Sequence, residues 1–447
     1  MAEPTILIIG AGTFGTSTAY HLSHQYKNSS RITIIDRWDP KAKLEEKQAA
    51  AIDTNRIIRT DYESGMYCDL ANEAIHPWFW NIAVQGHFHK AQTGWVVLDK
   101  KDGEFAVKVK ECFVKRGGDY TRDVDAEDLE QKHDVLKGLC RGELGEGYFN
   151  PEAGWCDAES ATTSFLKVAV NNGVRRVTGE VQELLLDESK SGIAGAKTRD
   201  GKLYTADKIV LATGAWISTL LSPIEDVLNI EEENRIERQI TAVGRLSAYF
   251  TLDANETQRI IDSKMPIVVI GGCVDIIPSS QSNRTLKIND LKTEVVNYVR
   301  TGKGRIITAP AAREQGDVPE KLKGEGMSVM SKALPEFTRS HAPARWRMCY
   351  DAVTPTEDWL LTRHPHPSLA NMVIATGGSF HSYKFLPVAG KYISKVLRGE
   401  RLDEEKERAW WWKSEQDLGR SGGLEFGAKV GAERRELRDF EEDRSRL

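Results

Sequence analysis

A glycine-rich turn between an apolar strand and a helix constrains the fold of this chain more than any other feature. Residues 5–9 are apolar and mostly β-branched, which predicts a strand buried on both faces of a parallel sheet. The next six residues form a G-x-G-x-x-G hexad, Gly10-Ala11-Gly12-Thr13-Phe14-Gly15. In this pattern Gly10 permits a tight turn, Gly12 lets the backbone approach a pyrophosphate, and Gly15 lets the helix pack on the strand.

The segment after the hexad completes one βαβ unit. Residues 16–25 predict a helix, whose N-terminus presents free N–H groups and the positive end of its dipole to phosphates. Residues 32–35 predict a second strand, which closes on Asp36, 21 residues after Gly15. An acid at this place can accept hydrogen bonds from both ribose hydroxyls and disfavours a 2′-phosphate. The unit predicts a dinucleotide site, although the hexad alone does not decide which dinucleotide binds.

Two later strands end in the same way as the first. Residues 208–214 and 372–377 are apolar runs that close on Ala-Thr-Gly, and glycine there allows the backbone to approach a ligand. The strand ends near residues 10, 214 and 377 are therefore expected to meet one ligand, which makes the nucleotide domain discontinuous. We expect a mixed α/β (α+β) fold with a Rossmann-like nucleotide domain formed by residues 1–90, 150–235 and 341–400.

The remaining segments differ in character. Residues 91–149 and 236–340 alternate short β-rich runs with charged helical stretches, and they predict a substrate or cap domain built on a mostly antiparallel sheet. Residues 401–447 form a charged tail whose one aromatic cluster is Trp410-Trp411-Trp412. These tryptophans are expected to dock the tail onto the body of the protein.

Bulk composition excludes several classes of function. With 61 basic and 66 acidic residues interspersed, the net charge of −5 leaves no basic face for nucleic acid. Six widely spaced cysteines without a C-x-x-C pair indicate neither a metal site nor a disulfide framework, and favour a reducing intracellular compartment. No stretch approaches the ~18 apolar residues of a membrane span, and the N-terminus lacks the pattern of a signal peptide.

Four further blocks follow the hexad along the chain: Asp53-Thr54-Asn55-Arg56-Ile57-Ile58-Arg59, Thr285-Leu286-Lys287-Ile288, Arg347-Met348-Cys349-Tyr350 and Gly377-Gly378-Ser379-Phe380-His381-Ser382-Tyr383-Lys384-Phe385. With these five blocks in order, the chain resembles the sarcosine oxidase superfamily, in particular its fungal branch of amadoriases (fructosyl amino acid oxidases) and saccharopine or pipecolate oxidases. The resemblance extends to about residue 400. It implies that FAD is the dinucleotide.

The resemblance also assigns roles on the cofactor side. The cysteine at the place of Cys349 holds the flavin in this family through a thioether to its 8α-methyl carbon, and Arg345 or Arg347 would favour the thiolate. Cys273 is the alternative candidate for attachment of the flavin. Arg56 matches a basic residue beside the flavin ring, where a cation favours the anionic reduced flavin. The other expected FAD contacts are Gly10, Gly12, Thr13, Phe14, Gly15, Asp36, Arg37, Val181, Gly214, Gly377, Gly378 and Lys384.

A second set of roles concerns oxygen and substrate. Lys287 matches the lysine that helps the reduced flavin react with oxygen, because a fixed cation stabilises superoxide as it forms. Bacterial members carry a histidine four residues later, where this chain has Leu291, so that histidine's role cannot be carried over. Arg59 and Lys384 match the pair that binds the substrate carboxylate. His381 is a candidate for lining the substrate pocket.

The expected reaction is oxidation of the C–N bond of a secondary amine or N-substituted amino acid to an imine, which then hydrolyses or cyclises, while oxygen becomes hydrogen peroxide. A small amine and oxygen are the expected partners of a monomer. The substrate stays open among glycated amino acids, saccharopine, pipecolate, sarcosine and N-methylated aromatic amines. The alternatives are a flavin-dependent dehydrogenase or monooxygenase acting on an N-methylated aromatic amine, and a non-enzymatic flavin-binding protein.

The last three residues concern localisation. Ser445-Arg446-Leu447 is a close variant of the S-K-L peroxisomal address. A peroxide-forming oxidase fits this compartment, because peroxisomes hold the enzymes that destroy peroxide. The sequence thus predicts binding to the peroxisomal import receptor, with a cytoplasmic location if the signal is not used.

Overall fold

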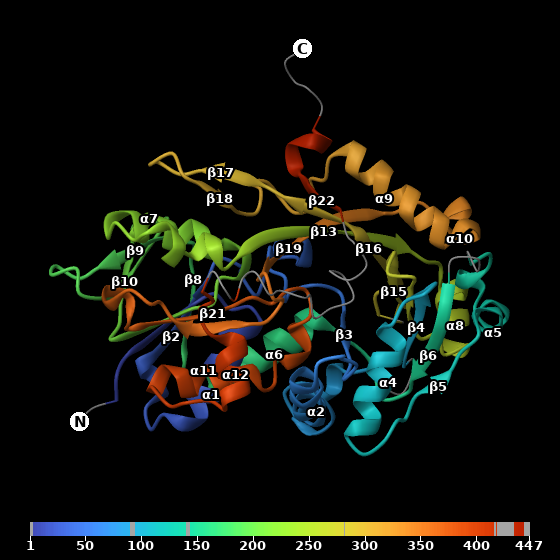
Figure 1. Cartoon of the computed structure of the whole chain (residues 1–447), viewed down its shortest axis with the longest axis horizontal. Coiled ribbons are helices and arrows are strands. Elements are labelled where there is room, and N and C mark those ends of the chain that lie inside the picture. Colours follow the sequence, from blue (N-terminus) through green and yellow to red (C-terminus); the bar gives the residue numbers. More distant parts are fainter. Residues whose placement is uncertain are drawn as a thin grey trace, which may run out of the picture.

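Two large sheets organise the chain in the computed structural model (Figure 1). The structure describes residues 3–89, 94–139, 144–280, 282–414, 417 and 433–441. None of the helices in these ranges combines the length and apolar composition that crossing a bilayer requires. The described residues also contain no group of three or more histidine, cysteine, aspartate or glutamate side chains arranged to hold a metal ion.

The first sheet is the nucleotide-binding sheet, and β1 lies inside it between β12 and β2. Its neighbouring pairs are parallel except for β20 with β21, as expected for a Rossmann-like unit. The Ala-Thr-Gly ends of β12 and β21 therefore lie beside the hexad, as the sequence predicts. The spatial order is β20 (Leu360–Arg363), β21 (Met372–Thr376), β12 (Lys208–Leu211), β1 (Ile6–Ile9), β2 (Ile32–Asp36) and β8 (Arg175–Thr178).

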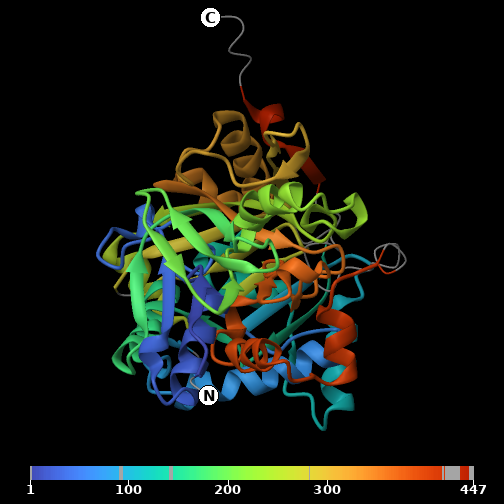
Figure 2. The same cartoon turned by 90° about the vertical axis from the view of Figure 1, so that its left-hand side faces the viewer.

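Alternate residues of β1 pack into two different cores. Ile6 and Ile8 face a core shared with the helices α1 (Thr13–Gln25) and α11 (Ala389–Arg398). Leu7 and Ile9 face a second core, shared with α7 and with a small three-stranded sheet (Figure 2). Burial on both faces explains why this strand is apolar throughout. The covering elements are α6 (Ala158–Asn171) beside α1, and on the other face α7 (Ile217–Val227), β9 (Val181–Leu186), β10 (Ile193–Thr198) and β11 (Leu203–Thr205).

The second sheet, here called the substrate sheet, has nine strands in the described part of the chain, and only β4 with β14 and β16 with β22 pair in parallel. Along the sheet follow β19 (Arg345–Val353), β13 (Thr241–Thr251), β16 (Thr285–Val296), β15 (Val274–Ile277), β14 (Ile267–Ile270), β4 (Trp95–Lys100), β6 (Leu144–Asn150) and β5 (Arg122–Asp123), with β22 (Glu433–Glu436) beside β16. One apolar core packs this sheet against helices that include α5 (Ala126–Lys132), α8 (Ala254–Asp262), α9 (Glu320–Ala333) and α10 (Pro335–Ser340).

Smaller elements connect the two sheets. The strands β3 (Arg56–Ile58) and β7 (Gly154–Cys156) pair with each other and carry Arg56 toward the substrate sheet. The helices α2 (Gly65–Trp80) and α4 (Phe105–Lys115) contribute to the core beneath the nucleotide-binding sheet. The described remainder includes α12 (Glu404–Trp410) and the hairpin of β17 (Tyr298–Arg300) and β18 (Ile306–Thr308).

The structure corrects two expectations. The domain boundary at residue 341 is wrong, because β19 pairs with β13 in the substrate sheet, so the return to the nucleotide-binding sheet follows residue 353. The first helix begins at Thr13 rather than at residue 16, because the chain enters the helix directly after Gly12. The charged tail also contributes a strand, since β22 joins the substrate sheet next to α9 (Figures 1 and 2).

The tryptophan cluster of the tail divides. Trp410 is buried and stacks on Trp359 at 4.5 Å between ring centroids. Trp412 is half-buried, with its ring 4.7 Å from that of His364. Trp411 is 48% exposed. Two of the three side chains therefore dock this segment, and the third does not.

Candidate active site

A cavity of about 670 Å³ is lined by residues of both sheets, a size typical of small-molecule and cofactor sites. Most of the residues predicted from the sequence line it: Gly10, Gly12, Thr13, Phe14, Asp36, Arg37, Arg56, Arg59, Val181, Gly214, Lys287, Cys349, Gly378, His381 and Lys384. Gly15 and Gly377 do not line it. The structure therefore gathers segments from the whole length of the chain around one space.

Glycine is required in the hexad for close packing. Gly10 has φ of +101°, and a Cβ there would lie 2.3 Å from the carbonyl oxygen of Ala212. A Cβ on Gly15 would lie 1.8 Å from the carbonyl oxygen of Gly10, which explains why Gly15 is needed although it does not face the cavity. Gly12 is the N-cap of α1, so the helix N-terminus opens on the cavity.

Polar groups follow the hexad along the cavity wall. Asp36 accepts a hydrogen bond from the Ala11 N–H at 2.5 Å through one carboxylate oxygen. The Arg37 guanidinium lies 4.1 Å from the centroid of the Trp216 ring and donates to the carbonyl oxygen of Gln48 at 3.0 Å. Gly377 has φ of +79°, and a Cβ there would lie 2.8 Å from the backbone nitrogen of Leu360, so this position requires glycine although it does not line the cavity.

Cys349 faces the cavity from β19, with 8% of its surface exposed. The basic group in contact with its Sγ is Arg56, whose Nη2 lies at 3.3 Å, rather than either arginine of its own strand. Arg345 instead stacks on the Tyr249 ring at 3.8 Å, and Arg347 donates to backbone oxygens of residues 49 and 52. Cys273 does not line the cavity and donates its thiol to the carbonyl oxygen of Gly271.

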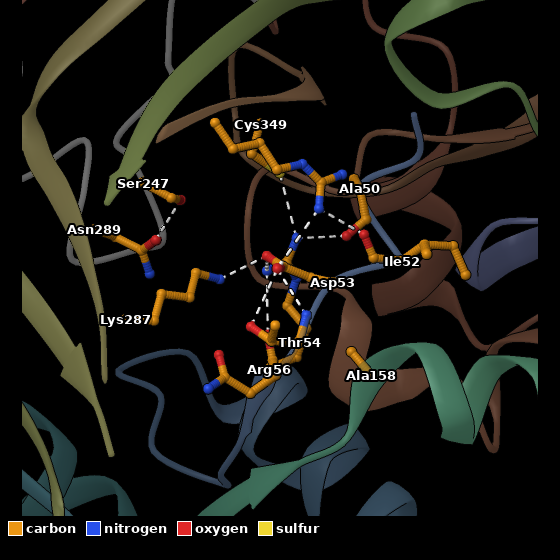
Figure 3. A network of polar contacts seen from close by, with 12 residues as sticks. Ala50, Ile52, Asp53, Thr54, Arg56, Ala158, Ser247, Lys287, Asn289 and Cys349 are labelled. Carbon is orange, nitrogen blue, oxygen red and sulfur yellow. Dashed lines mark hydrogen bonds and ion pairs between the residues drawn. The ribbon is translucent and has the colours of Figure 1, made fainter. Parts of the chain in front are cut away.

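Lys287 faces the same space from β16 and is 1% exposed (Figure 3). Its Nζ donates to Oδ2 of Asp53 at 2.7 Å. Burial lowers the pKa of Lys287 to about 8, although Asp53 opposes this shift. The lysine is therefore mostly charged at neutral pH. Leu291 also lines the cavity, at the place of the bacterial histidine.

Arg59, Lys384 and His381 converge on Tyr62. The guanidinium of Arg59 lies between two rings, 4.8 Å from the centroids of both Tyr62 and Trp95. Lys384 Nζ donates to the Tyr62 hydroxyl at 2.8 Å and to the His381 carbonyl oxygen at 2.5 Å. His381 Nδ1 lies 3.0 Å from the same hydroxyl. Two buried cations thus border one part of the cavity.

The sequence did not single out several residues that complete the site. Asp53 stands three residues before Arg56 in a block quoted for the resemblance, and an acid so near an expected flavin-side arginine was the signal that this block offered. Asp351 follows Cys349 by two, and the alternation of strand residues places both on one face. Burial raises the pKa of Asp351 to about 6. Tyr62 carried no signal of its own.

Comparison with known proteins decides the family. The profile of the family described as FAD dependent oxidoreductase (DAO) matches residues 5–396. The chain belongs to this FAD-dependent oxidoreductase family. It is 24% identical to the L-saccharopine oxidase of Schizosaccharomyces pombe, over 92% of this chain and 93% of that protein. It is 27% identical to the amino acid oxidase imqH of Aspergillus flavus, over 89% and 93%.

Solved structures agree on the fold. A fructosyl peptide oxidase from E. terrenum aligns with a TM-score of 0.81 at 23% identity, covering 100% of this chain and 99% of that chain. Amadoriase II of Aspergillus fumigatus, in complex with FSA, aligns with a TM-score of 0.80 at 20% identity, covering 98% and 97%. The comparisons confirm the expected family, the α/β fold class and the enzyme class of FAD-dependent amine oxidases.

The residues of the cavity fit the FAD of this family. Gly12 lines the cavity, and a Cβ there would have only the Ala51 Cβ within 4 Å, so a phosphate can approach the backbone at this point, with the α1 N-terminus and Asp36 beside it. Gly10, Gly12 and Asp36 would hold the pyrophosphate and ribose. Cys349 and Arg56 lie on another wall of the same cavity and would meet the flavin ring.

Proposed function

We propose that the protein is an FAD-dependent oxidase of a secondary amine or N-substituted amino acid that carries a carboxylate, with oxygen as the electron acceptor. The observation that carries this proposal is a single cavity that joins the glycine hexad, the Cys349–Lys287 wall and the cation pair Arg59 and Lys384. FAD would supply the redox chemistry when bound, by accepting a hydride equivalent from the carbon beside the amine nitrogen.

The protein's own groups orient and shield the reaction. Arg59 and Lys384 hold the carboxylate, so that the amine is fixed relative to the cavity wall. Lys287 places a positive charge where negative charge develops on oxygen. No buried side chain needs to act as a strong base, because an amine that binds neutral loses no proton before it is oxidised. The imine product hydrolyses in water unless it closes a ring first.

A substrate screen tests this function. The purified holoenzyme is offered sarcosine, pipecolate, saccharopine, glycated amino acids and N-methylated aromatic amines, while oxygen consumption and peroxide release are recorded together. Stoichiometric peroxide from one class supports an oxidase. An amine that bleaches the flavin without oxygen uptake would establish a dehydrogenase instead, and bleaching by no amine would contradict an enzyme of this class.

The cofactor is proposed to be covalent through Cys349, because this thiol lines the cavity beside Arg56. The denatured protein is expected to stay yellow, and its intact mass to exceed the mass of the polypeptide by one FAD. Cys349→Ser is expected to lose both properties while still folding, because serine is nearly isosteric. Cys273→Ser is the matched control. Covalent flavin in the Cys349→Ser variant would refute the attachment site.

Peroxisomal import is proposed from Ser445-Arg446-Leu447, which lies outside the described residues. The human relative, 24% identical, is named peroxisomal sarcosine oxidase. A fusion with a fluorescent protein at its N-terminus is expected to collect in peroxisomes, and removal of the last three residues to release it to the cytosol. Unchanged import after this deletion would show that the tripeptide does not act.

Since one chain supplies the whole cavity, we propose that the monomer is the active unit.

A further inference from the structure

Asp53 lies at the centre of the polar network on the cavity wall (Figure 3). It is fully buried. One carboxylate oxygen accepts from Lys287 Nζ at 2.7 Å and also pairs with Arg56. The other accepts from the Tyr249 hydroxyl at 2.7 Å and lies 3.6 Å from Nη1 of Arg347. A single carboxylate therefore meets three cations that come from three different strands or loops.

The charges of this network do not cancel. Three cations and one carboxylate leave a net charge of +2 in a buried place, which low dielectric makes costly. Burial alone would raise the pKa of Asp53, but Lys287, Arg56 and Arg347 lower it well below its usual range. Asp53 is therefore ionised wherever the protein is folded at ordinary pH, and Lys287 is the member of the network that can lose its charge.

Lys287 is close to that loss. The two arginines stay charged, whereas burial lowers the pKa of Lys287 to about 8. Each nearby cation also favours loss of the Lys287 proton. The carboxylate of Asp53, which contacts the ammonium group, opposes that loss. The charged or titratable groups that face Lys287 are Asp53 and Arg56 from the β3 segment, Tyr249 on β13, Arg347 and Cys349 on β19, and Asp275 on β15.

Asp275 is a weaker candidate for the same task. Its carboxylate accepts from the amide of Asn289 at 2.5 Å rather than from Lys287. Burial raises its pKa, so it carries its charge less firmly than Asp53 does. Asp53, which precedes β3, and Asp275, on β15, thus differ in their contact with Lys287 while sharing its surroundings.

We propose that Asp53 is a positioning residue that keeps the Lys287 side chain charged and fixed at the cavity wall. This inference deepens the proposed function, because the ammonium group of Lys287 is the one expected to serve oxygen. Without Asp53, Lys287 loses both its hydrogen-bond acceptor and the charge that compensates its own. The amine is then neutral at pH 7, and the oxygen reaction loses its cation although the lysine is present.

The first experiment measures the charge of Lys287 directly. Only a neutral amine undergoes reductive methylation, so the pH dependence of labelling by formaldehyde and cyanoborohydride, read by peptide mass spectrometry, gives the protonation midpoint. The holoenzyme is labelled from pH 5 to 10, with the exposed Lys190 as internal reference. The wild-type midpoint is expected at about 8. Asp53→Asn is expected to lower it by roughly 1–3 pH units, and Asp275→Asn, whose carboxylate accepts from Asn289 instead, to lower it by less.

The second experiment follows reoxidation of the substrate-reduced holoenzyme by oxygen at each pH. The wild-type rate is expected to fall as pH rises through 8, because Lys287 is charged only below its pKa. Asp53→Asn is expected to be about 2- to 100-fold slower at pH 7, because a midpoint roughly 1–3 pH units below 8 leaves that much less Lys287 charged, and to recover as the pH falls below its midpoint. Lys287→Arg keeps its charge throughout this range and is expected to remove the fall at pH 8, a result that does not depend on folding of the Asp53 variant.

The two experiments separate the inference from the function on which it rests. An unchanged labelling midpoint in Asp53→Asn overturns the role of Asp53, whatever the oxygen rates are. If the labelling midpoint of Lys287 falls in Asp53→Asn but the rate of reoxidation by oxygen does not change with it, Asp53 still sets the charge of Lys287. The assignment of Lys287 to the oxygen reaction is then overturned. A rate loss in Asp53→Asn that is equal at every pH shows a merely structural effect and also overturns the inference.

Discussion

A Lys287→Met variant is expected to take electrons from its amine at nearly the normal rate but to pass them to oxygen about 10²–10³-fold more slowly. Losing one preorganised charge at the place where charge develops costs roughly this much, ~3–4 kcal/mol. The ammonium group is buried, held by Asp53 and turned toward the cavity, so it has no reorganisation to undergo when oxygen reacts. It stabilises the charged state of oxygen more than the resting state.

Stopped-flow absorbance separates the two half-reactions of this variant. Mixing the oxidised enzyme with amine under nitrogen gives the first rate, and mixing the reduced enzyme with oxygenated buffer gives the second. Methionine nearly matches lysine in length, and Asp53 keeps Arg56 and Arg347 as partners, so the variant is expected to fold. Lys208→Met, on β12 outside the cavity, is the control. Fast reoxidation with collapsed reduction would assign Lys287 to the amine half-reaction.

Local sequence patterns predicted the nucleotide half of the molecule well. The apolar run before Gly10 is buried on both faces, and Asp36 closes β2 as the spacing from the hexad requires. The Ala-Thr-Gly ends at Gly214 and Gly377 follow strands that pair next to each other in one sheet. These features depend on contacts within or directly beside a βαβ unit, and such contacts constrain the spacing of residues along the sequence.

The contacts between the two sheets could not be predicted from residue spacing. Asp53 and Lys287 are 234 residues apart, and nothing in either segment states that they meet. The sequence shows two arginines in the strand of Cys349, yet the contact to its sulfur comes from Arg56 on β3. The placement of β19 in the substrate sheet was missed for the same reason, since strand pairing across domains is set by the packing of both sheets. The resemblance supplied these site residues individually, and the fold supplied their partners.

Lys384→Met is expected to weaken carboxylated substrates by about 1.5–3 kcal/mol, roughly 10- to 150-fold in kcat/KM, the scale of a charge-assisted hydrogen bond. Its ammonium group lines the cavity and is only 4% exposed as a residue, so water does not replace the lost interaction. Arg59→Lys tests the other cation while keeping its charge. Lysine cannot offer the forked pair of donors, so a loss in this variant reports geometry rather than charge.

The control for the carboxylate clamp lies in the substrate as well as in the protein. Lys391→Met removes a lysine that pairs with Glu73 at 2.7 Å outside the cavity, and kcat/KM is expected to stay unchanged. A decarboxylated analogue of the best substrate is expected to react poorly with the wild type and to lose nothing further in Lys384→Met. If kcat/KM for the analogue falls as much in Lys384→Met as kcat/KM for the parent acid does, Lys384 acts on the flavin or on the packing around Tyr62. The substrate would then bear no acid at this end of the cavity, and N-methylated aromatic amines would become the class to test first.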